Sequence, residues 1–245
     1  MPLLEVQGLS KHFGGLVAND RIDLRVDKGE IVGLIGPNGA GKTTLFNCIA
    51  GFYPPTAGNV QFKGEDITGL PANEICLRGI ARTFQIVRIF KDMSVLDNVM
   101  VGAFSRTNSA ARAKQRALEV LDFCGLAAKK SLLAGGLTIA DKKRLDFTKA
   151  LATDPSLLML DEAIAGLNQT ETAEAVELVK KVRESGITVL LVEHVMEVVM
   201  PISSRVVVLE YGKKIAEDSP EKVIQNEEVI KAYLGDKYHA SRRAH

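Results

Sequence analysis

The 245-residue sequence predicts an α/β protein with a mostly parallel core sheet, an antiparallel β part and a helical insertion. Late in the chain, short apolar runs bounded by turn residues alternate with amphipathic helical segments, which is typical of a parallel sheet covered on both faces. Near the N-terminus apolar and polar residues alternate, as in an antiparallel sheet with one solvent-exposed face. A long segment between these regions has the periodicity of helices.

The core sheet is predicted from four short apolar runs, at residues 31–35, 157–160, 188–192 and 206–209. Runs of this length without alternation are typical of strands that are buried on both faces. Between the second and third runs, residues 171–184 carry apolar side chains at helical spacing. This succession of strand, helix and strand indicates parallel pairing.

The other segments are expected to form two further parts of one domain. The antiparallel part is expected mainly over residues 1–30 and 58–85, and the helical part over residues 90–152. No repeat or low-complexity linker divides the chain, so residues 1–236 are interpreted as a single domain. Residues 237–245 are interpreted as a polar tail.

Composition and charge narrow the possible function classes. The net charge of +1 argues against a nucleic-acid partner, because binding nucleic acid usually requires a clearly basic surface. Cys48, Cys76 and Cys124 form neither a metal-ligand pattern nor a disulfide framework, which favours a reducing cytosol. We see no targeting segment and no apolar run that is long enough to span a bilayer, so we expect a cytoplasmic protein.

A phosphate-binding loop is predicted at residues 36–43, where GPNGAGKT matches the pattern G-x-x-x-x-G-K-[ST]. The loop follows the expected strand 31–35 and precedes a helix-compatible run, which is the context that the pattern requires. Backbone N–H groups of such a loop bind phosphates, and the helix N-terminus adds positive potential. The alternative interpretation is a structural glycine-rich turn.

The residues of this loop are expected to bind Mg·ATP. The Lys42 ammonium would reach the β and γ phosphates, and the Thr43 hydroxyl would ligate Mg²⁺. The loop alone does not distinguish an ATPase from a GTPase or a kinase. The predicted ATP-binding residues are Gly36, Pro37, Asn38, Gly39, Ala40, Gly41, Lys42, Thr43 and Thr44.

Two acidic residues, Asp161 and Glu162, follow the apolar run 157–160. A buried strand that ends in acids presents them at the carboxyl edge of the sheet, where the nucleotide sites of α/β folds lie. We therefore expect Asp161 to hold Mg²⁺, directly or through water, and Glu162 to polarise the attacking water. This second carboxylate favours an ATPase over a GTPase or a small-molecule kinase. The alternative is that both acids cap the next loop.

Two other polar residues carry little information by themselves. His194 comes just after the run 188–192, so its imidazole is expected near a γ-phosphate, although a single histidine at a strand end is more often structural. Gln85 follows the residues ARTF, and a lone glutamine predicts almost nothing.

Four of these elements, taken in order, resemble the nucleotide-binding subunit of an ABC transporter: Gly36–Thr43, Gln85, Leu157–Glu162 and His194. The resemblance covers nearly the whole chain and implies a P-loop NTPase fold of the ABC ATPase type. It implies that Gln85 contacts Mg²⁺ and the attacking water, that His194 senses the γ-phosphate, and that Phe13 stacks on adenine. It also implies a D-loop that crosses to a partner subunit and consists of Ala165, Gly166, Leu167 and Asn168.

The family signature LSGGQ is altered, and here consists of Leu137, Thr138, Ile139, Ala140 and Asp141. Both glycines are replaced, but Thr138 keeps a hydroxyl for the partner's nucleotide. Ile139 and Ala140 keep their backbone N–H groups, provided that their φ angles are negative. Asp141 adds a negative charge, which Lys142–Arg144 are expected to offset. We favour a variant that still closes on ATP over a weakened site, because the other catalytic positions are intact.

Two stretches, residues 80–103 and 220–235, resemble the ATPases of importers for branched-chain or other hydrophobic amino acids. The resemblance implies two ATP molecules between two ATPase subunits at the inner face of the cell membrane. The dimer would drive membrane permease subunits, which a periplasmic or extracellular solute-binding protein would supply. Residues 86–101 would contact the permease, and the alternative is that their apolar side chains belong to the core. Whether the second ATPase is an identical chain or a sibling stays open.

Three alternatives remain. The ATPase of lipopolysaccharide export has a similar C-terminal end. A regulatory subunit that no longer hydrolyses ATP would explain the altered signature, but Glu162 and His194 oppose it. A soluble ABC ATPase acting on nucleic acid or ribosomes usually carries coiled-coil insertions or two cassettes. This chain has neither, and its balanced charge also argues against that class.

Overall fold

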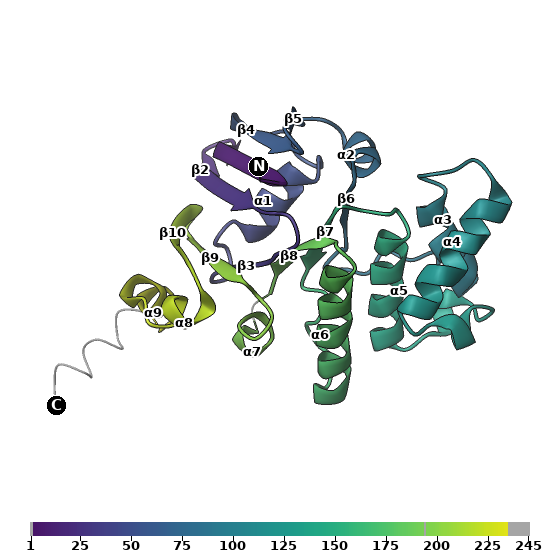
Figure 1. Cartoon of the computed structure of the whole chain (residues 1–245). Coiled ribbons are helices and arrows are strands. Elements are labelled where there is room, and N and C mark those ends of the chain that lie inside the picture. Colours follow the sequence, from purple (N-terminus) through teal and green to yellow (C-terminus); the bar gives the residue numbers. More distant parts are fainter. Residues whose placement is uncertain (1, 194, 235–245) are drawn as a thin grey trace. The chain divides into compact units, whose positions relative to one another are not determined.

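The computed structural model describes residues 2–193 and 195–234, which divide into two compact units (Figure 1). The first unit comprises Met1–Leu70 and Leu190–His245, and the second comprises Pro71–Val189. The chain contains a mixed sheet rich in parallel strands, an antiparallel sheet and helices, so the predicted α/β class is confirmed. Within the described residues, no helix has the length and apolar character needed to cross a membrane.

The antiparallel sheet belongs to the first unit and has the strand order β2-β1-β4-β5. Along β2, Ile22, Leu24 and Val26 are buried while the residues between them are exposed, which is the alternation that predicted one solvent-exposed face. Lys63 and Gly64, with φ angles of 54° and 81°, form the tight turn between β4 and β5. The bounds are β1 (Leu4–Phe13), β2 (Leu16–Val26), β4 (Ala57–Phe62) and β5 (Glu65–Asp66).

The predicted extent of the antiparallel part is corrected by the structure, because this sheet ends at Asp66 and not near residue 85. The helix α2 (Ala72–Arg78) follows, and it buries Ile75 on one face. The strand β6 (Ile80–Arg82) then pairs parallel with β7 (Leu157–Asp161). This stretch does not alternate apolar with polar residues, so its sequence does not favour an antiparallel edge.

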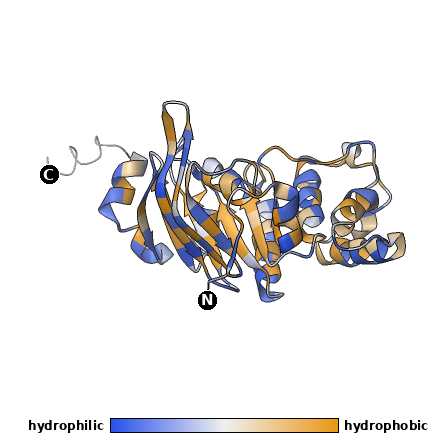
Figure 2. Cartoon of the chain, turned by 90° about the horizontal axis from the view of Figure 1, so that it is seen from above, coloured by the Kyte–Doolittle hydropathy of each residue, from blue (hydrophilic) through white to orange (hydrophobic). Residues whose placement is uncertain are grey.

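The first unit also contains the strands that carry the predicted phosphate loop. All five residues of β3 (Ile31–Ile35) are buried, and β3 pairs parallel with β9 (Arg205–Glu210). The strand β10 (Lys213–Asp218) pairs antiparallel with β9. Strands near the middle of Figure 2 are mostly hydrophobic, whereas the helices mix both residue types. The helices of this unit are α1 (Lys42–Ile49), α7 (Met196–Val199), α8 (Pro220–Val223) and α9 (Glu227–Leu234).

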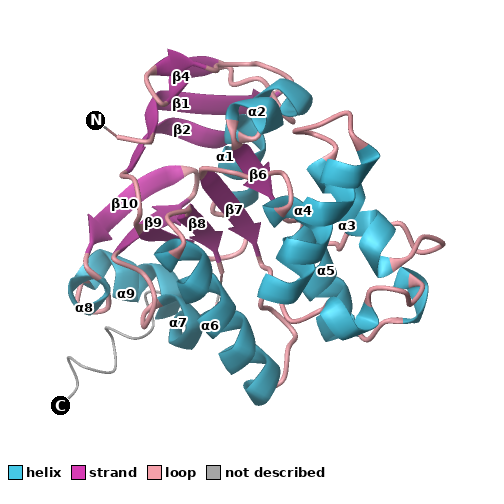
Figure 3. Ribbon diagram, turned by 45° about the vertical axis from the view of Figure 1, so that its right-hand side comes forward, coloured by secondary structure: helices cyan, strands magenta, loops and turns pink. Residues whose placement is uncertain are grey.

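The second unit is mainly helical. Figure 3 shows α3, α4 and α5 side by side, and Gly102 on α3 allows a close approach to α5, because a Cβ there would lie 2.3 Å from the Lys149 carbonyl oxygen. The strand β8 (Thr188–Val192) begins in this unit and ends in the first. The other elements are α3 (Val95–Ala103), α4 (Ala110–Phe123), η1 (Ala127–Lys129), η2 (Ala134–Gly136), α5 (Ile139–Leu151) and α6 (Gln169–Glu184).

Helices thus occupy much of the stretch 90–152. The boundaries of a helical subdomain, and the interpretation of residues 1–236 as a single domain, stay predictions. The predicted tail at residues 237–245 lies outside the described residues.

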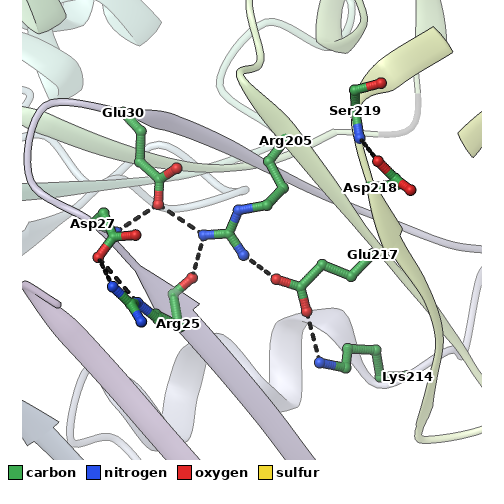
Figure 4. Close-up of polar contacts among 8 residues, drawn as sticks. All are labelled: Arg25, Asp27, Glu30, Arg205, Lys214, Glu217, Asp218 and Ser219. Carbon is green, nitrogen blue, oxygen red and sulfur yellow. Dashed lines mark hydrogen bonds and ion pairs between the residues drawn. The ribbon is translucent and has the colours of Figure 1, made fainter. Parts of the chain in front are cut away.

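An ion-pair network around Arg205 connects β9 and β10 with the end of β2 (Figure 4). The Arg205 guanidinium donates to Glu30 at 2.7 Å, to the Arg25 carbonyl oxygen at 2.5 Å, and to Glu217. Burial acts to lower the pKa of Arg205, but the two carboxylates outweigh it and raise the pKa above its usual value. The network therefore stabilises the charged guanidinium where the strands meet.

We expect Arg205→Met to lower the free energy of unfolding by about 1–3 kcal/mol, because two largely buried carboxylates lose a charged donor. The matched control is Arg25→Met, whose side chain makes an exposed ion pair with Asp27 and is expected to cost about 0.5 kcal/mol or less. Urea unfolding of both variants measures the difference. Equal losses would show that the Arg205 network contributes no more than a surface pair.

Candidate functional site

The predicted phosphate loop connects β3 to α1 in the first unit. Its first residue, Gly36, has a φ of 149°, and a Cβ there would lie 2.1 Å from the Leu209 carbonyl oxygen. Gly41 precedes α1 with a φ of 96°, a left-handed conformation that favours glycine. Gly36 is thus required by close packing against β9, and Gly41 by its backbone conformation and by close packing against β2. Asn38, Gly39 and Thr43 are exposed, so they are accessible to a ligand.

Lys42 lies at the start of α1, and only 7% of its surface is exposed. Its ammonium donates to the carbonyl oxygens of Gly36 at 2.7 Å and Pro37 at 2.9 Å, so the charge lies against the loop itself. No acidic residue occurs in the first turn of α1. The helix N-terminus and the lysine together give this loop the positive character that phosphates require.

One contact of the phosphate loop was not anticipated from the sequence. The fully buried Asn19 donates from Nδ2 to the Gly41 carbonyl oxygen at 3.1 Å, and thereby fixes the loop to β2.

Phe13, the predicted adenine contact, is 42% exposed and packs edge-on against Tyr53, with ring centroids 5.4 Å apart. The Lys11 ammonium lies 5.0 Å from the centroid of the Phe13 ring. An exposed ring held in this way is suited to stacking on a base.

In the second unit, β7 ends at Asp161, which is 1% exposed. Its carboxylate forms an ion pair of 2.8 Å with Arg82, and its backbone N–H donates to the Thr83 hydroxyl at 3.1 Å. Burial lowers the pKa of Arg82, and the carboxylate of Asp161 opposes this shift. The sequence reasoning missed Arg82, which lies 79 positions from its partner in the chain.

Glu162 comes directly after β7 and has a φ of 48°, an uncommon conformation for a glutamate. The side-chain amide of Gln85 donates to its carboxylate at 2.9 Å. The Lys143 ammonium donates to its backbone carbonyl oxygen at 3.0 Å and to that of Ala165 at 2.6 Å. The structure thus brings together two residues that the sequence predicted for one site, Gln85 and Glu162, and adds Lys143.

The altered signature segment forms the start of α5. Thr138 is the N-cap, and its hydroxyl accepts from the Asp141 backbone N–H at 3.1 Å. Ile139 and Ala140 lie in the first turn with negative φ, as expected, so their N–H groups point out of the helix N-terminus. The side chain of Leu137, just before the cap, is buried.

The prediction that Lys142–Arg144 offset the charge of Asp141 is wrong. The Asp141 carboxylate pairs instead with Lys129 at 2.5 Å and also bonds the Thr138 hydroxyl at 3.0 Å. Helix geometry explains this for Lys142 and Lys143, because side chains one and two positions after Asp141 project onto other faces of α5. Arg144, three positions after Asp141, pairs instead with Glu174 on α6.

The predicted D-loop leads into α6. Asn168 caps this helix in a reciprocal arrangement with Glu171, and Gly166 has a φ of 77°. Ala165 accepts from Lys143, whereas Gly166 and Asn168 are exposed. Leu167 is partly buried.

The phosphate loop and Phe13 are thus described within the first unit, and Gln85, the carboxylates, the signature and the D-loop within the second. His194, the predicted γ-phosphate sensor, lies outside the described residues. Within the part of the chain that the structure describes, no group of three or more His, Cys, Asp or Glu residues could hold a metal ion.

Comparison with known proteins decides the family. A model described as "ABC transporter" matches residues 19–165, and one described as "Branched-chain amino acid ATP-binding cassette transporter" matches residues 213–239. The chain belongs to the ABC transporter family. The predicted resemblance and the ATPase class that it implies are therefore confirmed.

The similar proteins match nearly the whole chain. The high-affinity branched-chain amino acid transport ATP-binding protein BraF of Pseudomonas aeruginosa is 42% identical, over 96% of this chain and 98% of its own length. The corresponding protein LivG of Escherichia coli is 43% identical over the same shares. A nucleotide-free ATP-binding cassette from an ABC transporter has a TM-score of 0.88 at 30% identity, and the match covers 96% of this chain and all of that one.

Two further matches bear on the alternatives. The lipopolysaccharide export system ATP-binding protein LptB of Escherichia coli is 32% identical, over 97% of this chain and 99% of its own length. A cassette solved as a dimer in a post-hydrolysis state, bound to ADP and Pi, has a TM-score of 0.80 at 25% identity and covers 89% of this chain and 98% of its own. The identity to LptB is thus lower than that to BraF and LivG.

We expect Lys42→Met to weaken ATP binding at least tenfold, because charge-assisted bonds to phosphate are lost while the helix is kept. Isothermal titration of the purified chain with ATP measures the dissociation constant. The matched control is Lys28→Met, a lysine of the same unit outside the loop, which should bind ATP normally. An unchanged constant in Lys42→Met would contradict the assigned role of the lysine.

Proposed function

We propose that this ABC ATPase is the motor subunit of an importer for branched-chain or other hydrophobic amino acids. The observation that carries the proposal is similarity to BraF and LivG along almost the whole chain, reinforced by the separate match at residues 213–239. That segment lies outside the part matched by the general ABC transporter model, so it supports the subfamily independently.

Hydrolysis is assigned to Glu162, which directly follows β7, and to Gln85, which bonds its carboxylate. Glu162 polarises the attacking water, and Gln85 orients the carboxylate through the bond of 2.9 Å. The positive φ of Glu162 supports this assignment, since strained backbone of this kind concentrates at active sites. In the first unit, Lys42 and the loop amides hold the phosphates, and Phe13 stacks on the base. His194 is proposed to sense the γ-phosphate.

The donor set is suited to Mg²⁺ that arrives with the nucleotide. Mg²⁺ prefers oxygen ligands and is commonly bound through one or two carboxylates together with substrate phosphates, rather than by an all-protein cage. The ligands predicted from the sequence are oxygens of this kind: the Thr43 hydroxyl in the first unit, and the Gln85 side-chain oxygen and the Asp161 carboxylate in the second. Because Asp161 also neutralises Arg82, we propose that it holds the ion through water. Bound Mg²⁺ would neutralise charge that develops on the phosphates.

The working unit is proposed to be a dimer of ATPase subunits, which holds two ATP molecules and is docked on membrane permease subunits at the inner face of the cell membrane. The exposed N-terminus of α5 offers its N–H groups to the partner's nucleotide, and a cassette of similar fold has been solved as a dimer. A solute-binding protein would supply the permease. Nucleic acid is not a proposed partner, in keeping with the net charge of +1.

Two alternatives to an amino acid importer ATPase are each motivated by a specific observation. Similarity to LptB at 32% identity favours lipopolysaccharide export less than the identities of 42% and 43% favour amino acid import. A subunit impaired in hydrolysis is motivated by the altered signature. The Lys129–Asp141–Thr138 contacts oppose it, because they keep the segment ordered as a capped helix start.

We expect Glu162→Gln to reduce ATP turnover by about 10²-fold or more and to trap an ATP-bound dimer, because the amide cannot polarise the water. Phosphate release and size-exclusion chromatography in ATP measure the two effects. Glu177→Gln, at an exposed position of α6, is the matched control. Unchanged phosphate release in Glu162→Gln would rule out Glu162 as the catalytic carboxylate.

For the transported solute, we expect stimulation by aliphatic amino acids. The test purifies the chain with its permease and solute-binding partners from membranes, reconstitutes the complex, and measures ATPase activity with a panel of amino acids and with lipopolysaccharide. Leucine, isoleucine and valine should raise the rate. A response to lipopolysaccharide alone would favour the export alternative, and no response to any aliphatic amino acid would contradict the subfamily proposal.

A further inference from the structure

Lys143 connects α5 to the segment between the catalytic carboxylate and the D-loop. Its ammonium donates to the carbonyl oxygens of Glu162 at 3.0 Å and Ala165 at 2.6 Å, which are the two ends of that segment. All three residues belong to the second unit. The side chain of Lys143, on α5, thus holds the backbone at both ends of the segment 162–165, which follows β7.

The surroundings of Lys143 strengthen these bonds. The lysine lines a small cavity of about 40 Å³, whose other walls include Leu160, Ile164 and Leu167. The two bonds are partly buried, so solvent competes less for the carbonyl oxygens than it would at an exposed surface. Charge-assisted hydrogen bonds are stronger in such apolar surroundings than in water.

The backbone that Lys143 holds is strained. Glu162 has a φ of 48°, and a left-handed glutamate persists only when its surroundings fix it. Gln85 bonds the carboxylate of this residue, and Lys143 bonds its carbonyl oxygen. The side chain of Glu162 is therefore held at one end and its backbone at the other.

We propose that Lys143 is a positioning residue for ATP hydrolysis, which holds the backbone of Glu162 and ties it to the helix that starts with the signature segment. The proposal rests on the catalytic role proposed above for Glu162. Lys143 lies about one turn, or about 6 Å, after Ile139 along α5. A shift of α5 when its N-terminus meets the partner's nucleotide would thus reach this chain's own catalytic carboxylate through a single side chain.

The neighbouring lysine provides a matched comparison. Lys142 lies on the same helix and carries the same charge, but the hydrogen bonds to the Glu162 and Ala165 carbonyl oxygens come from Lys143. A general effect of positive charge near the signature would lower kcat when either lysine is replaced. A positioning effect would lower kcat only when Lys143 is replaced.

The test measures steady-state ATPase kinetics of Lys143→Met in the assembled transporter. We expect kcat to fall on the order of 10²-fold with KM for ATP unchanged, because misplacement of a catalytic group slows the chemical step and leaves the phosphate loop intact. Lys142→Met should keep the wild-type kcat. Lys143→Arg should recover most of the activity, since a guanidinium still donates to two carbonyl oxygens.

A double-mutant cycle distinguishes positioning from loss of structure. If Lys143 acts through Glu162, Lys143→Met should not slow the residual turnover of Glu162→Gln any further. Thermal unfolding checks that each variant is folded, and Lys143→Gln replaces the methionine variant if that one does not fold.

Two results would overturn the inference: a normal kcat in folded Lys143→Met, or an equal loss in the Glu162→Gln background and in the wild type. The single variant Glu162→Gln separates this failure from that of the proposed function. If Glu162→Gln is inactive while Lys143→Met turns over normally, only the role of Lys143 is wrong. If Glu162→Gln turns over normally, both assignments fail.

Discussion

The buried ion pair between Arg82 and Asp161 is the interaction on which the proposed catalytic residues of the second unit depend. It joins the carboxyl ends of β6 and β7, the two parallel strands from which Gln85 and Glu162 emerge. Removing either partner of such a pair would leave a buried charge uncompensated, which typically costs about 3–5 kcal/mol. The ion pair and the strand pairing therefore fix the ends of β6 and β7, so the bond between Gln85 and Glu162 needs little further ordering.

The sequence predicted those parts of the fold and site that depend on local patterns. The loop at residues 36–43 is recognisable because its glycines are required by the backbone at each position, as Gly36 and Gly41 illustrate. Buried strands such as β3 are recognisable from short apolar runs. Arg82 and Lys143 could not be found in this way, because their partners are set by strand pairing and helix packing between distant segments. The predicted antiparallel part extends to residue 85, but the sheet ends at Asp66. Residues 67–85 do not alternate apolar with polar side chains, so their sequence carries no local signal for this sheet.

The altered signature segment forms a regular, capped helix start. In place of two glycines the chain begins a regular helix, with Thr138 as its cap and Asp141 in the first turn. Lys129 neutralises the added carboxylate, which would otherwise repel a phosphate near the helix N-terminus. The Thr138 hydroxyl is already engaged with Asp141, so we propose the N–H groups of Ile139 and Ala140 as the more direct donors to the partner's phosphate.

Because the residues proposed to grip ATP and those proposed to hydrolyse it belong to different units, binding and turnover should depend on separate sets of contacts. In the first unit, Lys42 is held by the loop's own carbonyl oxygens, so we expect ATP affinity to depend mainly on that loop. In the second, the orientation of Glu162 depends on Gln85 and Lys143, which lie on segments of the same unit. Lys143 also shares α5 with the segment offered to the partner subunit. The helix α5 would then connect the segment proposed to contact the partner's nucleotide with the lysine proposed to position Glu162.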